Sequence, residues 1–389
     1  MGFRYSAEMP RLAGARVTVM GLGLSGGGTG VARFLAHQGA KVTVTDLKPE
    51  KDLREPMAEL AGLPIDFHLG GHRDEDFTGA DLVVVNPAIP DSSREVAIAA
   101  ASGVPLETEM NLFFKRCPAL RIAAVTGSNG KTTTTAILGE LLSRGPSTVH
   151  VGGNIGRSLL ETPIAPDDVV VLELSSFQLE NLDALRRSPT VSVVMNLTPN
   201  HLDRHGTMAA YAAAKHVIVK HQRADDTKVL NADDPLVAAL ASPSRTRWFS
   251  MKRQADAYAH DDVIEMAGGS IDVSGRRIPG WFNLQNMAAA TLAAAAVWPG
   301  ALGMAQEVLT GFKGVEHRLE LVGEVAGVTY YNDSIATNPE STLAALDTLR
   351  GGIVLLLGGR DKNLEPLRLR SGHRWRLGTH AVVRAPIVA

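Results

Sequence analysis

The stretch Arg121-Ile-Ala-Ala-Val-Thr-Gly-Ser-Asn-Gly-Lys-Thr-Thr133 decides the fold of this chain. Its first residues, Arg121–Val125, are short, apolar and partly β-branched, as is typical of a buried parallel strand. The residues from Lys131 onward begin a helix, and the core of a phosphate-binding loop, G-x-x-G-K-T, lies between the two. A strand that leads through such a loop into a helix predicts a parallel α/β domain.

Each residue type in this loop suits the binding of phosphate. Gly127 and Gly130 allow the backbone to curl around phosphate oxygens, Lys131 offers a mobile cation, and Thr132 offers a hydroxyl to Mg²⁺. Val125 stands where the common loop has its first glycine, so the match is incomplete. A Gly-Lys-Thr can occur by chance in a turn, but the strand-to-helix setting favours a nucleotide site made of Thr126, Gly127, Ser128, Asn129, Gly130, Lys131, Thr132 and Thr133.

A second glycine motif, Gly21-Leu-Gly-Leu-Ser-Gly26, lies nearer the N-terminus. It follows a predicted strand at Arg16–Met20, precedes a predicted helix, and has Asp46 twenty residues beyond Gly26. This is the setting of a dinucleotide site, in which a diphosphate approaches backbone N–H groups at a helix N-terminus. The residues alone leave three interpretations open: NAD, another diphosphate ligand, or a purely structural turn.

The composition limits the classes of protein to which the chain can belong. The chain has 389 residues, 45% of them hydrophobic and 21% charged, which indicates a globular protein of two or three domains. A net charge of −2 argues against a dedicated nucleic-acid binder. The single cysteine, Cys117, excludes an internal disulfide framework and fits a reducing compartment. No apolar run is long enough for a membrane helix and no signal peptide is visible, so we expect a cytoplasmic protein without membrane partners.

Three regions each begin a new alternation of short strands and helices. The first has predicted strands at Arg16–Met20, Lys41–Thr45 and Leu82–Val85, with helices around Thr29–Gln38 and Ser92–Ala101. The second has predicted strands at Arg121–Val125, Val169–Leu174, Val191–Asn196 and Lys228–Asn231, a β-rich insertion at Ala255–Pro279 and a helix at Asn283–Trp298. In the third we expect strands within Glu320–Tyr331, a helix at Asn338–Leu349 and a buried strand at Ile353–Leu357. The expected domains are residues 1–116, 117–314 and 315–389.

Further motifs make the chain resemble the Mur ligase family over roughly residues 15 to 365. The variant Leu172-Glu-Leu-Ser-Ser-Phe-Gln-Leu-Glu180 points to the member that adds D-glutamate. The resemblance also includes Gly152-Gly-Asn-Ile-Gly156, Asn196-Leu-Thr-Pro-Asn-His-Leu-Asp-Arg-His-Gly206, Tyr211-Ala-Ala-Ala-Lys215, Asn231-Ala-Asp-Asp234, Asn283-Leu-Gln-Asn286, Glu316-His-Arg-Leu-Glu320, Asn332-Asp-Ser-Ile-Ala-Thr-Asn338 and Gly358-Gly-Arg-Asp-Lys362.

The resemblance implies a three-domain α/β protein. Its N-terminal domain would be Rossmann-like and bind a UDP-linked substrate, its central domain would be a P-loop ATPase-like unit, and its C-terminal domain would be Rossmann-like and apparently truncated. The implied reaction belongs to peptidoglycan precursor synthesis. ATP phosphorylates the carboxylate of UDP-N-acetylmuramoyl-L-alanine, and the amine of D-glutamate attacks the acyl phosphate, leaving ADP and phosphate. We expect the enzyme to be a monomer.

The resemblance also assigns roles to residues. Lys131, Glu173, His201 and Lys215 would be catalytic, and Thr132, Glu173, His201 and a carbamylated Lys215 would hold two Mg²⁺ ions. Glu173 is awkward in a core, since an unpaired buried carboxylate is costly, and this supports a functional role independently. The other nucleotide-binding residues would be Asn283, Asn286, Arg318, Asp333, Thr337 and Asn338, and the substrate-binding residues would be Ser25, Asp46, Asn154, Ser175, Gln178 and Lys362.

The chain departs from the family at three places. Ile335 stands where the family usually has a lysine, and Phe282 where it usually has a histidine. From about residue 368 an arginine-rich tail replaces the expected sequence, so we expect a truncated or frameshifted ending. A nucleotide-binding remnant without ligase activity, a sibling ligase for another amino acid and an NAD-dependent enzyme are therefore the alternatives.

Overall fold

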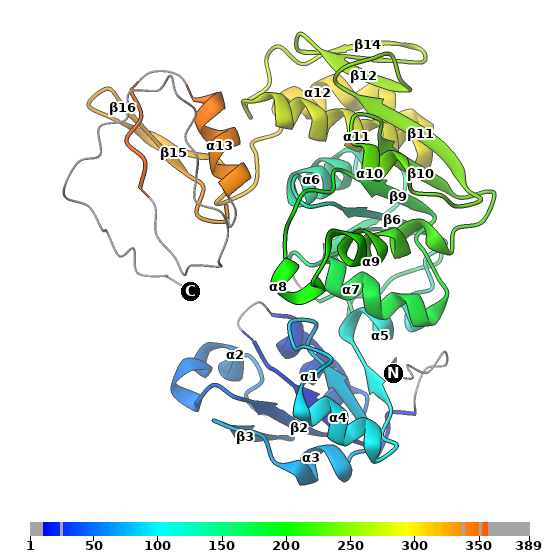
Figure 1. Cartoon of the computed structure of the whole chain (residues 1–389), viewed down its shortest axis with the longest axis vertical. Helices are drawn as coiled ribbons and strands as arrows, with labels where there is room; N and C mark the ends of the chain where they lie inside the picture. Colours follow the sequence, from blue (N-terminus) through cyan, green and yellow to red (C-terminus); the bar gives the residue numbers. More distant parts are fainter. Residues whose placement is uncertain (1–10, 24–25, 157, 337–338, 350–351, 357–389) are drawn as a thin grey trace.

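The computed structural model describes residues 11–23, 26–156, 158–336, 339–349 and 352–356, and Figure 1 shows their arrangement. The N-terminal unit is built on a five-stranded sheet of order β3-β2-β1-β4-β5 in which every pair is parallel. Its strands are β1 (Arg16–Met20), β2 (Lys41–Asp46), β3 (Ile65–Leu69), β4 (Leu82–Val85) and β5 (Leu106–Glu107). Its helices are α1 (Gly27–His37), η1 (Glu50–Asp52), α2 (Arg54–Ala58), α3 (Asp74–Thr78) and α4 (Arg94–Ala101).

The central unit is a nine-stranded sheet of order β14-β13-β12-β11-β10-β9-β6-β8-β7. The pairs from β7 to β12 are parallel, and only the last two pairs, at the β14 edge, are antiparallel. The strands are β6 (Arg121–Thr126), β7 (Val149–Gly153), β8 (Val169–Glu173), β9 (Val191–Val194), β10 (Thr227–Asn231), β11 (Arg245–Ser250), β12 (Ala257–His260), β13 (Val263–Met266) and β14 (Gly269–Asp272).

Helices connect and cover these strands. The helix α5 (Glu109–Arg116) leads from the N-terminal sheet into the central one. The long apolar α11 (Trp281–Val297) packs on α6 (Lys131–Leu142) and the central strands, and all of its residues from Asn283 to Ala294 are buried. The helices after α5 are α6 (Lys131–Leu142), α7 (Ser176–Leu182), η2 (Asp183–Leu185), α8 (Leu202–His205), α9 (Met208–Lys220), α10 (Pro235–Ala238), α11 (Trp281–Val297), η3 (Pro299–Met304) and α12 (Ala305–Gly311).

The N-terminal and central units share one hydrophobic core. A single buried cluster includes Val19 of β1, Phe34 of α1, Phe114 of α5 and Leu172 of β8. Because core side chains pack closely and resist displacement, the two sheets are held against each other rather than joined by a free linker. A second cluster fills the space between α6, α11 and the other side of the central sheet.

A small third unit follows α12. It consists of the antiparallel hairpin of β15 (Glu320–Val325) and β16 (Val328–Asn332) and the helix α13 (Pro339–Thr348), drawn in orange in Figure 1. The predicted strand at Ile353–Leu357 is wrong for the residues that the structure describes. Residues 352–356 form no strand, and Val354 is 89% exposed. An apolar run becomes a buried parallel strand only where a neighbouring strand pairs with it, and no described strand does so here.

Most other predicted elements agree with the structure to within a few residues. The strands at Arg16–Met20 and Leu82–Val85 have the predicted bounds, and the one at Arg121–Val125 is longer by Thr126. The segment Ala255–Pro279 is β-rich as predicted, and its strands β12, β13 and β14 extend the central sheet. Within the described ranges, no helix combines the length and the apolarity needed to cross a membrane.

Candidate active site

The phosphate loop joins the carboxyl end of β6 to the first turn of α6. Gly130 begins the helix with a φ of +84°, a left-handed conformation that glycine adopts without strain. Ser128 donates a hydrogen bond to the Thr198 carbonyl at 2.8 Å, and the Asn129 backbone pairs with the side chain of Asn196 at 2.8 and 3.1 Å. The loop is therefore fixed from the side of β9 before any ligand binds.

Glu173 lies directly beside this loop. It ends β8 opposite Val125 of β6, which places its carboxylate at the carboxyl edge of the sheet. Thr132 Oγ1 donates to Glu173 Oε2 at 2.7 Å and Asn154 Nδ2 donates to Glu173 Oε1 at 2.9 Å. Both oxygens of this buried carboxylate thus have partners, which offsets the cost of burying it.

Lys215 reaches the same place from α9. Its side chain is buried, and Nζ donates to Thr126 Oγ1 at 3.1 Å. Burial lowers the pKa of Lys215 well below its ordinary value, and the nearby Lys131 lowers it further while Glu173 opposes the shift. A lowered pKa favours the neutral amine, which is the nucleophilic form of lysine.

Lys131 completes the charged group. Its Nζ donates to the Ser128 carbonyl at 3.0 Å. Burial lowers the pKa of Lys131, Arg318 lowers it further, and Glu173 opposes the shift. Two lysines and one carboxylate thus lie together at the ends of β6 and β8, and an anionic ligand beside them would favour the charged form of the lysines.

His201 lies in the segment between β9 and α8, beside an aromatic residue of α7. It sits at the N-cap of α8 with a φ of 53°, and its ring meets the edge of Phe177 at 5.1 Å between centroids. Phe177 also stacks on His205, whose side chain is buried and bonded to Ser176. Burial lowers the pKa of His205 to about 4, with a further contribution from His201. The aromatic contact therefore holds His201 next to a histidine that stays neutral at pH 7.

The donor set fits Mg²⁺ better than a soft metal. The available groups are the Glu173 carboxylate and the Thr132 hydroxyl, both hard oxygen ligands. Within the described ranges, no group of three His, Cys, Asp or Glu side chains lies close enough to hold an ion by itself. A cation here would therefore need oxygens from elsewhere, such as the phosphates of a nucleotide.

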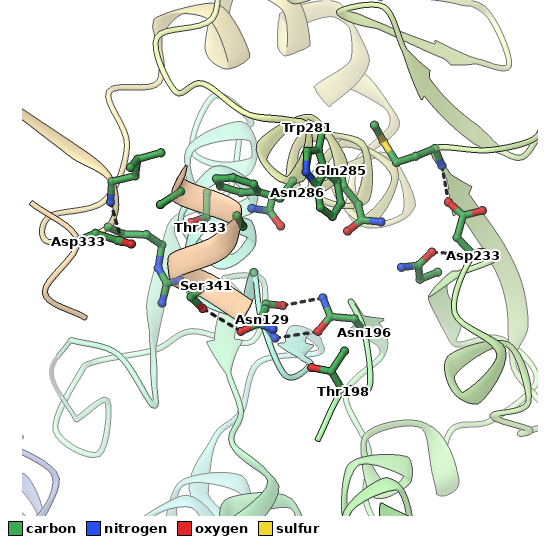
Figure 2. A pocket seen from close by; sticks show the side chains of 18 of the residues that line it. Asn129, Thr133, Asn196, Thr198, Asp233, Trp281, Gln285, Asn286, Asp333 and Ser341 are labelled. Atoms are coloured by element: carbon green, nitrogen blue, oxygen red, sulfur yellow. Dashed lines mark hydrogen bonds between the residues drawn. The ribbon is translucent and has the colours of Figure 1, made fainter. Parts of the chain in front are cut away.

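A cavity of 430 Å³ opens next to the loop, as Figure 2 shows. The loop residues Asn129, Gly130 and Thr133 form one wall and residues of α11, including Asn286, form another. Arg318 and Asp333 line the side toward the third unit. The Nε of Arg318 is buried and has no hydrogen-bond partner among the described residues. A nucleotide whose phosphates lay on the loop would have this cavity beside it for its nucleoside.

The two predicted asparagines of α11 have different positions. Asn286 lies on the cavity wall and accepts a hydrogen bond from Thr134 at 3.3 Å. Asn283 is not among the lining residues. Its Oδ1 accepts from Asn286 Nδ2 at 3.2 Å, and its own Nδ2 donates to the Pro279 carbonyl. Asn283 therefore contacts Asn286 rather than the cavity, and this hydrogen bond orients the Asn286 amide.

The sequence interpretation missed several lining residues. Trp281, at the start of α11, lies on the cavity and is 57% exposed, which is unusual for a large aromatic side chain. Ser341 of α13 donates to Asn129 Oδ1 at 3.2 Å and so ties the third unit to the phosphate loop. A signal did exist for two others, because they lie at or just after the carboxyl ends of predicted strands, as active-site residues of α/β folds do: Asn196 and Asp233.

One of the predicted substrate residues lies in the N-terminal unit, and the other described ones lie in the central unit. Asp46 ends β2 and accepts from the Gly23 N–H at 3.3 Å, so it holds the N-terminal glycine motif. Asn154 belongs to the Glu173 cluster. Ser175 and Gln178 form a capping box at the start of α7, in which each side chain bonds the backbone of the other. The predicted residues Ser25, Thr337, Asn338 and Lys362 lie outside the described residues.

The two departures from the family lie at the nucleotide cavity or close to it. Phe282 lines the cavity and meets Trp281 edge to face at 6.1 Å between centroids. Ile335 is 42% exposed, and its N–H bonds the His317 carbonyl one residue before Arg318. Both replacements put apolar atoms where the family usually has a basic side chain.

Comparison with known proteins identifies relatives over nearly the whole chain. Residues 15–107 match the Mur ligase MurD-like N-terminal domain and residues 125–294 match the Mur ligase middle domain. The UDP-N-acetylmuramoylalanine–D-glutamate ligase of Roseiflexus sp. is 48% identical over 91% of this chain and 80% of its own length. The ligase of the same name from Koribacter versatilis is 40% identical over 90% of this chain and 78% of its own.

Solved structures support the same fold. The UDP-N-acetylmuramate–alanine ligase of Thermotoga maritima superimposes with a TM-score of 0.60 at 24% identity, covering 86% of this chain and 77% of that one. The UDP-N-acetylmuramate:L-alanyl-gamma-D-glutamyl-meso-diaminopimelate ligase of Neisseria meningitides gives 0.58 at 20% identity, covering 78% of this chain and 100% of that one. At these identities the likeness concerns the fold.

Gly130→Ala should weaken nucleotide binding. A Cβ at this position would lie 2.4 Å from Asn286 Oδ1, and the left-handed φ costs an L-residue about 1–2 kcal/mol. The loop would relieve this strain by leaving its cradle, and binding would have to restore it. We expect the Kd for ATP, measured by calorimetry with Mg²⁺ present, to rise at least about tenfold, the equivalent of 1.4 kcal/mol.

Gly62→Ala is the matched control. Gly62 has the same φ of +84°, but nothing lies within 4 Å of the Cβ that alanine would add. This variant has the strain without the clash, in a turn away from the loop, and should leave the Kd for ATP unchanged. Equal affinities for the two variants would contradict the role given to Gly130.

Proposed function

The chain belongs to the Mur ligase family, and we propose that it is the ATP-dependent ligase that adds D-glutamate to UDP-N-acetylmuramoyl-L-alanine, forming ADP. The observation that carries this proposal is the bonded group Thr132–Glu173–Asn154 beside the phosphate loop, with Lys131 and Lys215 next to it. The names and identities of the relatives support the choice of D-glutamate over the amino acids of sibling ligases.

The chain's residues would serve the first step by holding the triphosphate. The loop backbone and Lys131 bind the β- and γ-phosphates, and the Arg318 guanidinium offers further donors from across the cavity. Mg²⁺, when bound, would neutralise charge on the phosphates that the substrate carboxylate must approach. Glu173 and Thr132 are the oxygen donors that would hold it at the end of β8.

The second step needs an activated carboxyl group. A carboxylate is a poor electrophile, so its oxygen is first made a good leaving group by phosphorylation. The amine of D-glutamate then attacks the carbonyl carbon and phosphate departs with the bonding electron pair. The Lys131 ammonium and the Arg318 guanidinium would stabilise the negative charge that develops on these oxygens.

We further propose that Lys215 is carbamylated. A free ammonium would repel Mg²⁺, whereas a carbamate is an anion with oxygen ligands suited to a hard cation. Formation of the carbamate requires the amine nitrogen to attack CO₂ and lose a proton. The buried position of Lys215 beside Thr126 and within reach of Glu173 supports this role, and with His201 it would complete the second of two Mg²⁺ sites.

The N-terminal glycine motif would bind the UDP part of the substrate rather than NAD. Its match to the N-terminal domain of this ligase type supports that choice, and Asp46 holds the motif by its bond to Gly23. We assign residues 1–116 to this role, residues 117–314 to ATP and catalysis, and residues 315–389 to the amino acid. Lys362 would meet the glutamate side chain. We also propose that the enzyme is a monomer, and consumption of ATP favours the cytoplasm.

Release of phosphate should depend on both substrates. With ATP, Mg²⁺ and UDP-N-acetylmuramoyl-L-alanine, we expect steady release of phosphate only when D-glutamate is added, because the acyl phosphate otherwise has no attacking amine. Lys131→Ala should lower kcat at least about a hundredfold, the usual effect of removing one donor to a developing charge. L-Glutamate, L-alanine and a diamino acid form the control panel.

Three other results, from that assay or from titrations with ATP and NAD, would each favour a different alternative. Turnover with L-alanine or the diamino acid would make this a sibling ligase. ATP binding without turnover for any amino acid would make it a nucleotide-binding remnant. Binding of NAD to the N-terminal unit, with no effect of the UDP substrate, would favour the dehydrogenase alternative.

Carbamylation can be observed directly. Protein equilibrated with ¹³C-bicarbonate should show one carbamate carbon resonance, which Lys215→Arg removes because a guanidinium does not react with CO₂. Lys228→Arg is the matched control. Lys228 is also buried, but its Nζ donates to Ser242 O, Ser242 Oγ and Ser244 O at 3.0–3.1 Å, so it should remain an amine. A resonance that survives in Lys215→Arg would contradict the assignment.

A further inference from the structure

One face of α1 contacts residues outside the N-terminal sheet. Gly27, Gly30, Arg33 and His37 recur at intervals of three or four along this helix, so they lie on the same face. Gly27 meets Glu109 at the start of α5, and the other three meet the segment Ser158–Glu161, which follows β7 in the central unit. We call this segment the docking loop.

The two glycines let the helix backbone come very close. A Cβ on Gly30 would lie 2.3 Å from Cβ of Ser158, and one on Gly27 would lie 3.1 Å from Oε2 of Glu109. The first distance is shorter than any real contact between carbon atoms. Gly30 therefore acts here through the absence of a side chain, which allows the docking loop to press on the helix itself.

Charged side chains connect the C-terminal end of this face of α1 to the docking loop. Arg33 Nε donates to Glu161 Oε2 at 2.7 Å, and Nδ1 of His37 lies 2.5 Å from Glu161 Oε1. Partial burial raises the pKa of Glu161, but the hydrogen bonds from Arg33 and His37 lower it more, so that it stays below its ordinary value. One carboxylate of the central unit thus bridges two basic side chains of the N-terminal unit.

A third contact between α1 and the docking loop is made through a side chain of α5. Arg116, at the end of α5, lies over the ring of Phe34 with its guanidinium carbon 4.7 Å from the centroid, and it also donates to the Leu160 carbonyl. Phe34 and Leu160 are buried in the core that the two sheets share. The docking loop is therefore held to α1 by backbone contact, ion pairs and an apolar core together.

The two ends of this contact lead to two different sites. α1 follows directly on the glycine motif that ends at Gly26. The docking loop follows Asn154, whose side chain donates to Glu173 in the catalytic group. A shift of α1 against the docking loop would therefore change the distance between the two phosphate-binding places of the molecule.

We propose that Gly30, Ser158 and Glu161 are positioning residues, which set the carboxylate of the UDP-linked substrate against the γ-phosphate of ATP. This inference rests on the function proposed above. ATP would be held by the central unit and the third unit, so its binding should not depend on α1. The transfer step should depend on it strongly, because a misplacement of about 1 Å can cost about a hundredfold in rate.

The first pair of variants introduces a steric clash between α1 and the docking loop and then removes it. Gly30→Ala should lower kcat by at least about tenfold in the phosphate-release assay, while the KM for ATP stays within about twofold. Alanine favours a helix interior by roughly 1 kcal/mol over glycine, so the loss would not come from a weakened helix. Gly30→Ala combined with Ser158→Gly should restore kcat, because Ser158 Cβ is the atom that the new methyl group meets.

A second pair of variants tests the charged end. Glu161→Gln should lower kcat by about threefold, the equivalent of a partly exposed ion pair worth 0.2–1 kcal/mol. Arg16→Gln is its matched control, since Arg16 forms an ion pair of 2.8 Å with Asp81, and both residues belong to the N-terminal unit. The control should leave kcat unchanged. A similar loss in both variants would show that any lost surface pair has this effect, and would overturn the role of Glu161.

A distance measurement makes the test independent of turnover. Spin labels at the exposed positions Lys51 and Asp225, in a Cys117→Ala background, report the separation of the two units. The distribution should broaden or shift in Gly30→Ala and return in the double variant. If the unaltered protein shows no turnover but this pattern holds, the proposed function fails and the docking contact stands.

The opposite results overturn the inference. An active Gly30→Ala variant with unchanged distances would show that the contact does not position the substrate. A loss that Ser158→Gly does not rescue, or one accompanied by an equal loss of ATP affinity, would show general damage to the fold instead.

Discussion

The pairing of β6 with β8 is the constraint on which the rest of the site depends. Its register places Glu173 opposite Val125, one residue before the phosphate loop begins. The Leu174 N–H then bonds the Val125 carbonyl at 2.9 Å, and Thr126 Oγ1 donates to the Leu174 carbonyl at 2.7 Å. A slip of one residue would turn Glu173 to the other face of the sheet and leave the loop without its carboxylate.

Electrostatics then explains why such a costly arrangement is present. Lys131 and Lys215 lie beside a single carboxylate, and burial disfavours the charged form of both. Groups of this kind are expensive to keep in a protein interior unless a ligand completes them. In the proposed function the triphosphate would supply negative charge beside Lys131, and carbamylation would turn Lys215 into an anion.

The sequence was sufficient where local pattern and chemistry coincide. Short β-branched runs predicted seven of the ten strands from β1 to β10, and the glycine turn before Lys131 predicted the loop, whereas β3, β5 and β7 were not predicted. Prediction from the sequence failed where contacts between residues distant in sequence determine the structure. The apolar run at Ile353–Leu357 has the composition of a strand but no described neighbour, and the helical spacing of α11 does not say that Asn283 stands behind Asn286. The contact of Gly30 with Ser158 joins residues far apart in sequence, and a glycine inside a glycine-rich stretch gives no signal of it.

The central claim is that Glu173, held beside the phosphate loop, is a ligand of the metal that accompanies ATP. Paramagnetic resonance of Mn²⁺ with a non-hydrolysable ATP analogue tests it most directly. Glu173→Gln, which keeps the shape of the side chain, should weaken Mn²⁺ binding by more than about tenfold, while Glu180→Gln on the neighbouring helix should not. Unchanged Mn²⁺ affinity in Glu173→Gln would contradict the account.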